Sequence, residues 1–384
     1  MKFTKTALAV AAIVGSVAAS AQTANVTLYG YINTSIESNR GSQGTNSVGK
    51  TPTSATVNRM TANSSRFGFR GREELGGGTY AMFQLENSFG SDDGSLGGGV
   101  LFGREAWVGL GGGFGEVKIG YGLTPYDDVL GLAHQNIGST GLQNRNNGFS
   151  GGPGFATNQL FTNYGRGGVS SANNQGNFDA RSANAISYAS PNFGGLRFRT
   201  MYSLIAESSS SPNAKLWDTA VIYANGPMTL AATYALHKDF GGFAGVTTGT
   251  HDQNAWRVYG RYDFGVARID GSYDVTSYKL ATGTLKMKYF DAAVQVPFGA
   301  STASLQYSQR DNGAAWAYSP PIGYTAPTVT QLINNWSVGG GKHIALVYDY
   351  AFSKRTQLYA YYASMKNETG GKLNTPAIGI IHKF

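Results

Sequence analysis

The sequence predicts an all-β protein, a transmembrane antiparallel up-and-down barrel of about 16 strands. Three observations predict it. Short segments in which apolar and polar residues alternate recur along the 384 residues. Tight Gly-containing turns alternate with long loops, as in an up-and-down meander. No apolar run approaches the roughly 18 residues of a transmembrane helix. Such a sheet has to close, because lipid offers no partner for the backbone groups of an open edge.

The first 21 residues are expected to be a secretory signal peptide rather than part of the barrel. Lys2 and Lys5 form a positive start, a short apolar stretch follows, and a small-x-small cleavage pattern ends at Ala21. We therefore expect residues 1–21 to be removed and residues 22–384 to form a single barrel domain. The chain has no cysteine, so we expect strand pairing rather than disulfides to hold this exported domain together.

Each strand is predicted from a period of two residues. In the first, Val26, Leu28 and Ile32 share one face, and Asn33 and Glu37 share the other. The same alternation predicts strands at approximately 26–38, 55–75, 78–90, 100–111, 114–123, 183–190, 194–207, 216–225, 227–238, 254–264, 266–280, 284–297, 300–311, 342–352, 355–368 and 374–384.

The composition favours a membrane barrel over a sandwich or a soluble barrel. The apolar faces mix large aromatic residues with glycine and alanine uniformly from strand to strand, which suits contact with lipid better than a packed core. About 16 strands are too many for a small ligand-binding barrel. The last segment, AIGIIHKF at 377–384, is an apolar strand that ends on Phe384. We expect this strand to close against the first one.

Several stretches resemble a known family. They are VTLYG at 26–30, SRFGFRGREELGGG at 65–78, FGREAWVGL at 102–110, FGEVKIG at 114–120, and NAISY at 184–188 followed by PNFGGL at 191–196. Their order resembles the general porins of Gram-negative bacteria, and most closely the anion-selective porins of β-proteobacteria.

The resemblance implies a homotrimeric, 16-stranded barrel in the outer membrane, embedded in its lipid. It also implies a long third loop, at about 124–182, that folds into the lumen and narrows it. By motif, the family's ladder of wall arginines corresponds to Arg66, Arg104 and Arg181, and a lumen-facing carboxylate corresponds to Glu86. Acidic residues of the loop, Asp127 and Asp128, are expected to oppose the arginines across the constriction.

The alternation independently predicts that the arginines of the second strand point inward. Arg66, Arg70 and Arg72 share one face, opposite Phe67 and Phe69. An arginine on the lipid face near the midplane costs roughly 2–4 kcal/mol. We therefore include Arg70 in the predicted constriction.

Arg104 fits the alternation less well. It shares its parity with the apolar residues Val108 and Leu110, whereas Glu105 shares its parity with Trp107. One of the two charges therefore faces lipid, lies near an interface, or follows a β-bulge.

The predicted function is a water-filled channel for passive diffusion of small hydrophilic solutes, anionic or neutral, with a preference for anions. Guanidinium groups stay charged at biological pH and concentrate anions in a narrow pore. A channel dedicated to one substrate remains an alternative, because lumen tyrosines and girdle tyrosines have the same sequence pattern. An outer-membrane hydrolase is a weaker alternative, because the five histidines are dispersed. No catalytic residue, cofactor, metal or nucleic-acid partner is predicted.

Overall fold

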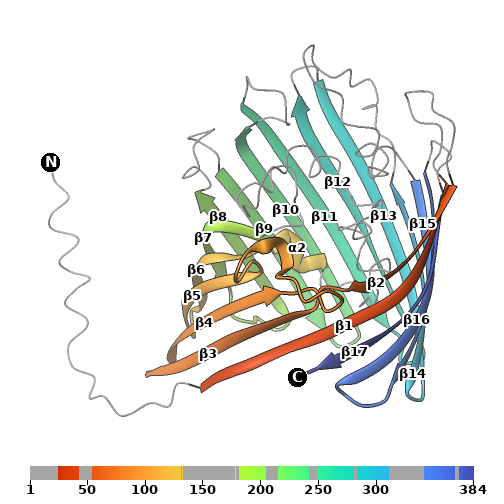
Figure 1. Cartoon of the computed structure of the whole chain (residues 1–384). Coiled ribbons are helices and arrows are strands. Elements are labelled where there is room, and N and C mark those ends of the chain that lie inside the picture. The colour runs from red at the N-terminus through yellow and green to blue at the C-terminus, as the bar shows by residue number, and fades with distance from the viewer. Residues whose placement is uncertain are drawn as a thin grey trace, which may run out of the picture.

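The described part of the protein is almost entirely β-sheet (Figure 1). The computed structural model describes residues 25–42, 54–130, 132, 178, 181–204, 215–241, 250–280, 283–310, 341–367 and 372–384. The predicted signal peptide and most of the predicted constriction loop lie outside these residues. The strands are β1 (Asn25–Ser42), β2 (Ser54–Ala62), β3 (Arg66–Gly76), β4 (Thr79–Ser88), β5 (Glu105–Gly112), β6 (Gly115–Leu123), β7 (Arg181–Ala189), β8 (Leu196–Leu204), β9 (Lys215–Asn225), β10 (Met228–Gly241), β11 (Thr250–Asp263), β12 (Arg268–Leu280), β13 (Gly283–Phe298), β14 (Ser301–Arg310), β15 (Gly341–Ala351), β16 (Thr356–Asn367) and β17 (Lys372–Lys383); a 3-10 turn η2 (Gly97–Gly99) and a short helix α2 (Pro125–Leu130) complete the elements.

The sheet closes on itself through its first and last strands. Consecutive strands pair antiparallel, except that β2 and β3 both pair with β1. β17 also pairs with β1, with Ile378 opposite Ile36 and Lys383 opposite Tyr31. The Phe384 amide donates to the Gly30 carbonyl oxygen at 3.0 Å, and the Gly30 amide donates back to the Phe384 carbonyl oxygen at 3.1 Å. The prediction that the last strand closes against the first is therefore confirmed.

The second strand of the barrel is interrupted, which corrects the predicted continuous strand at 55–75. β2 pairs with the C-terminal half of β1, and β3 pairs with its N-terminal half. The two segments therefore occupy one position in the barrel, and the 17 segments form a barrel of 16 strands. Ser64, at the break, has a positive φ of 58°, outside the range of extended strands. Asn63 donates to Ser35 Oγ and to the Tyr359 hydroxyl, both at 2.9 Å.

The two faces of the sheet are distributed as the alternation predicts. On β1, the outward-facing Val26, Leu28 and Ile36 are more than half exposed, whereas Asn33 and Glu37 are at most 3% exposed. This arrangement places apolar side chains toward lipid and polar ones toward the interior. No helix in the described ranges is long and apolar enough to cross a membrane.

The barrel wall is lower on one side. β3 to β8 contain 8–11 residues each, whereas β10 to β13 contain 13–16. Figure 1 shows the long strands rising above the short ones. The arginines that surround Glu86 and Glu105, described below, lie on or beside the strands of the low wall.

Barrel closure yields a first testable prediction, at Gly30. A Cβ added there would lie 2.7 Å from Phe384 Cζ and 3.0 Å from Phe67 Cα, both too close for a side chain. Gly30→Val is therefore expected to destabilise the closed barrel by about 1–3 kcal/mol, as overpacking commonly does. The measurement is the heat-modifiable, folded fraction on an unheated detergent gel. Gly113→Ala is the control, because a Cβ there meets nothing within 4 Å. Equal folded fractions for the two variants would contradict the prediction.

Candidate constriction of the barrel

Glu86 on β4 is the centre of a charged cluster on the inner wall. Arg104 Nε donates to Glu86 Oε1 at 2.6 Å, and Arg66 Nε lies 3.6 Å from Glu86 Oε2. The Glu86 side chain is only 9% exposed, whereas the Arg66 side chain remains 30% exposed. The structure thus brings two of the predicted constriction arginines together around a third predicted residue, Glu86.

Tyrosines of β1 position these charges. The Tyr29 hydroxyl donates to Glu86 Oε2 at 3.1 Å and accepts from Gln84 Nε2 at 2.8 Å. The Arg66 guanidinium lies over the Tyr31 ring, 4.3 Å from its centroid, and donates to the Tyr31 hydroxyl at 2.9 Å. Cation–π contact and hydrogen bonding together hold the guanidinium against the wall.

Arg70 lies further along the same face of the strand. Its guanidinium lies 5.1 Å from the centroid of the Tyr29 ring, and the residue is exposed. The guanidinium of Arg70 is therefore exposed to solvent, whereas those of Arg66 and Arg104 both face the carboxylate of Glu86.

The parity difficulty at Arg104 is resolved by the position at which β5 begins. The strand starts at Glu105, which pairs with Glu86 across the sheet. Arg104 precedes the strand, so the alternation of β5 does not constrain its side chain. Its amide donates to the Glu86 carbonyl oxygen at 3.1 Å. Both charges at 104 and 105 therefore reach the interior, and neither faces lipid.

Arg181 joins the cluster through Glu105. Arg181 Nε lies 3.9 Å from Glu105 Oε1, and the two side chains are 22% and 14% exposed. Glu105 also accepts a hydrogen bond from the Trp107 indole at 2.8 Å. Glu105 is directly opposite Glu86, so the ion pairs of Glu86 and the Arg181–Glu105 pair lie side by side on the wall. Arg70 adjoins them through Tyr29, whose hydroxyl donates to Glu86. We call this group the Arg–Glu cluster; it comprises Arg66, Arg70, Arg104, Arg181, Glu86 and Glu105.

The helix α2, which carries Asp127 and Asp128, follows β6 and packs against the inner side of the wall (Figure 1). Val129 belongs to one buried apolar cluster with Ala220 of β9 and Ala231 of β10. Asp128 forms an ion pair with Arg199 of β8. The Asp127 amide lies 3.3 Å from its hydrogen-bond acceptor, Thr124 Oγ1.

Tyr126 is the main anchor of α2. Its amide donates to Asp218 at 3.1 Å and its hydroxyl donates to Asp274 Oδ1 at 3.0 Å. Arg257 donates to the Tyr126 carbonyl oxygen at 2.9 Å, lies over the Tyr126 ring, and forms an ion pair with Asp274. These residues are almost completely buried. Three different strands thus hold one tyrosine.

Acidic side chains are concentrated on the wall formed by β9 to β13. Asp218, Asp270, Asp274 and Asp291 are each at most 2% exposed, and Arg257 lies among them. The basic side chains of the Arg–Glu cluster lie on β3 to β7. The described interior therefore has a basic low wall and a more acidic high wall.

Sequence reasoning did not select several residues of this interior: Lys118, Arg199, Arg257 and Asp274. The signal was present for Arg199 and Arg257, which alternate with outward-facing aromatic residues on their strands. The alternation did not reveal their partners, because these are distant in the sequence. Asp128 is 71 residues from Arg199, and Tyr126 is 131 residues from Arg257.

The chain is similar to known outer-membrane proteins over nearly all of its length. A family model described as Gram-negative porin matches residues 6–370. Outer membrane porin protein 32 of Delftia acidovorans is 30% identical over 382 residues, which cover 98% of this chain and 93% of that protein. An outer membrane porin protein of Bordetella pertussis is 29% identical over 415 residues, covering 99% of this chain and 100% of that protein. Among solved structures, an anion-selective porin from Comamonas acidovorans superposes with a TM-score of 0.68 at 25% identity, covering 94% of this chain and 100% of that one.

Proposed function

The chain belongs to the Gram-negative porin family and is an outer-membrane porin, and we propose that its channel prefers small anions because of the Arg–Glu cluster. One observation carries the proposal: the cluster holds four guanidinium groups and only two carboxylates. The similar porin from Comamonas acidovorans is described as anion-selective, which supports the same preference for anions over cations.

The mechanism is electrostatic. Guanidinium groups stay protonated at every biological pH. A low-dielectric wall focuses their field into the aqueous passage, which raises the local concentration of anions and lowers that of cations. The tyrosines on β1 hold Arg66 and Arg70 in place, so no reorganisation is needed when a solute passes. Screening weakens the effect as salt rises, because the Debye length is about 10 Å at 0.1 M.

The segment at 124–182 is proposed to narrow the lumen beside the cluster. Two features support this: α2 begins directly after β6, and Tyr126 and Asp128 fasten it to inward-facing residues. The proposed constriction residues are the Arg–Glu cluster together with Asp127 and Asp128. We further propose a cleaved signal peptide at residues 1–21 and a homotrimer.

Diffusion without a chemical reaction is proposed as the whole activity. A Gly-x-Ser-x-Gly sequence occurs at 148–152, the spacing of a hydrolase nucleophile elbow. An elbow also needs a strand before it and a helix after it, and the surrounding residues are rich in Gly and Asn without either pattern. The permeating solutes are small, hydrophilic, and anionic or neutral.

The test is a planar-bilayer measurement on the purified protein in a KCl gradient. A channel that prefers anions lets Cl⁻ cross faster than K⁺, so the dilute side becomes negative at zero current. The expected result is this sign of potential, with a magnitude that falls as both salt concentrations are raised. A potential of zero or of opposite sign would overturn the anion preference, and inserted protein without conductance would overturn the channel.

A further inference from the structure

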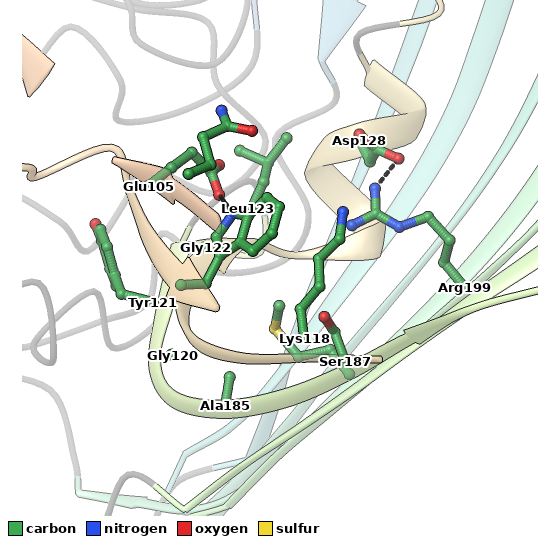
Figure 2. A pocket seen from close by; sticks show the side chains of 13 residues that line it. Glu105, Lys118, Gly120, Tyr121, Gly122, Leu123, Asp128, Ala185, Ser187 and Arg199 are labelled. Atoms are coloured by element: carbon green, nitrogen blue, oxygen red, sulfur yellow. Dashed lines mark hydrogen bonds and ion pairs between the residues drawn. The ribbon is translucent and has the colours of Figure 1, made fainter. Parts of the chain in front are cut away.

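A hollow of about 170 Å³ opens on the inner wall beside the Arg–Glu cluster (Figure 2). Its lining comes from β4 to β8 and from α2. Lys118 lies directly across the sheet from Ser187, which in turn is opposite Met201. Figure 2 shows Lys118 and Arg199 extending from the wall toward α2, which carries Asp128. Neighbouring strands therefore form the wall of the hollow, and the anchored helix α2 lies over it.

Gly120 leaves space for the neighbouring Trp107, whose indole forms one side of the hollow. Trp107 is directly opposite Gly120, whose φ is +139°. A Cβ at Gly120 would lie 2.8 Å from Trp107 Cα, too close for any side chain. The register of β6 against β7 shifts between Gly120 and Gly122, and such irregularities re-aim side chains next to functional sites. The indole consequently lies in the hollow with its nitrogen on Glu105.

The charges that line the hollow balance. Lys118 Nζ lies 4.4 Å from the centroid of the Trp107 ring, and Arg199 pairs with Asp128. Lys118 Nζ also lies 3.3 Å from Glu116 Oε2, a residue outside the lining. Within the lining itself, the cations Lys118 and Arg199 equal in number the carboxylates of Asp128 and Glu105. Glu105 belongs both to the hollow and to the Arg–Glu cluster. Guanidinium groups outnumber carboxylates in the cluster, whereas positive and negative groups are equal in number in the lining of the hollow.

An apolar surface completes the hollow. Leu123 and Met201 line it together with the indole of Trp107. A solute that fits this lining presents one positive group, one negative group and an apolar body. A purely anionic solute would meet the repulsion of Glu105 and Asp128, and a purely cationic one would meet that of Lys118 and Arg199.

We propose that this hollow is a binding subsite for small zwitterions with an apolar or aromatic side chain, which is the chemistry of an α-amino acid. The carboxylate of the solute binds Lys118 and Arg199, its ammonium group binds Glu105, and its side chain packs on Trp107. Figure 2 shows Glu105 on the opposite side of the hollow from Arg199 and Asp128. The inference rests on the proposed function in one respect, that solutes pass along this wall. It adds a preference that the Arg–Glu cluster alone would not produce.

The experiment compares three probes of the same shape on the wild-type channel in KCl at pH 7. L-Phenylalanine carries both charges, 3-phenylpropionate lacks the ammonium group, and phenethylamine lacks the carboxylate. Each is added while the single-channel current is recorded. Phenylalanine is expected to interrupt the current at the lowest concentration, at least about threefold below either analogue, since each missing ion pair weakens binding.

Trp107→Ala should raise the phenylalanine concentration needed for interruption by about tenfold, because aromatic contact is lost. Trp217→Ala is the matched control, since Trp217 is 54% exposed on the outward face of β9, and it should leave that concentration unchanged. Should Trp107→Ala give no conducting channels, the three-probe comparison on the wild type decides.

Two results would overturn the zwitterion subsite. One is interruption by 3-phenylpropionate at a concentration equal to or below that of phenylalanine. The other is no interruption by any probe while conductance and the KCl-gradient potential stay normal. In both cases the porin function stands, because conductance and the gradient potential report it separately.

Discussion

Replacing Arg66 and Arg104 together by glutamine is expected to lower the anion-over-cation permeability ratio roughly tenfold. Both side chains contact Glu86. The double variant therefore removes two positive charges and leaves this carboxylate without either of these ion-pair partners. A unit charge about 8 Å from a permeating ion contributes roughly 2 kcal/mol at an effective dielectric constant of 20, and about 1.4 kcal/mol is a factor of ten. Screening reduces the full effect of two charges to that order.

The opposite change provides a test with the opposite sign. Glu86→Gln removes a negative charge from the same cluster and should raise the permeability ratio. Arg72→Gln is the matched control: Arg72 lies on the same strand and already pairs with Glu74 in an exposed ion pair at 2.6 Å. Its effect should be small. The measurement is the zero-current potential in a KCl gradient at low and high salt. An unchanged ratio in the double variant would rule out the Arg–Glu cluster as the source of selectivity.

Replacing Arg257 by methionine is expected to reduce the free energy of unfolding by about 3–5 kcal/mol. The Arg257 and Asp274 side chains are 1% and 0% exposed. Removing the guanidinium therefore leaves a buried carboxylate without its ion-pair partner, and it also removes the hydrogen bond to the Tyr126 carbonyl oxygen. The same change loosens α2, so single-channel conductance should rise if this helix narrows the lumen.

Two comparison variants separate these effects. Arg257→Met combined with Asp274→Asn removes both charges of the ion pair and should recover part of the lost stability, because residue 274 is then no longer a buried charge without its ion-pair partner. Arg268→Met breaks an ion pair whose side chains are 42% and 39% exposed, and should cost less than about 1 kcal/mol. The measurements are denaturant midpoints in detergent and conductance in bilayers. A single Arg257 variant as stable as wild type would contradict the prediction.

The architecture could be predicted because its information is local. Each strand alternates with a period of two, so a short window of sequence shows which side chains face lipid. Leu28 and Ile36 lie outside, and Asn33 and Glu37 lie inside, as the alternation of that strand alone predicts. The same parity placed Arg66 and Arg70 on the inner face, because charge on the lipid face is costly.

The candidate site could be predicted only in part. Family motifs and parity selected Arg66, Arg70, Arg104, Arg181 and Glu86, and the structure shows that Glu86 contacts two of the arginines. Parity failed at Arg104, because a strand boundary one residue away releases its side chain. It also treated 55–75 as continuous, because a single residue with positive φ at Ser64 leaves no periodic trace.

By itself, the sequence determined the antiparallel barrel of 16 strands and the face on which the side chains within a strand lie. The tertiary structure decided which charges meet: Arg199 with Asp128, Arg257 with Asp274 and Tyr126, and the indole of Trp107 with Glu105. The physical reason is that alternation follows from the geometry of one strand, whereas pairing depends on the register of neighbouring strands and on where α2 is anchored. Those are long-range properties that only the closed barrel establishes.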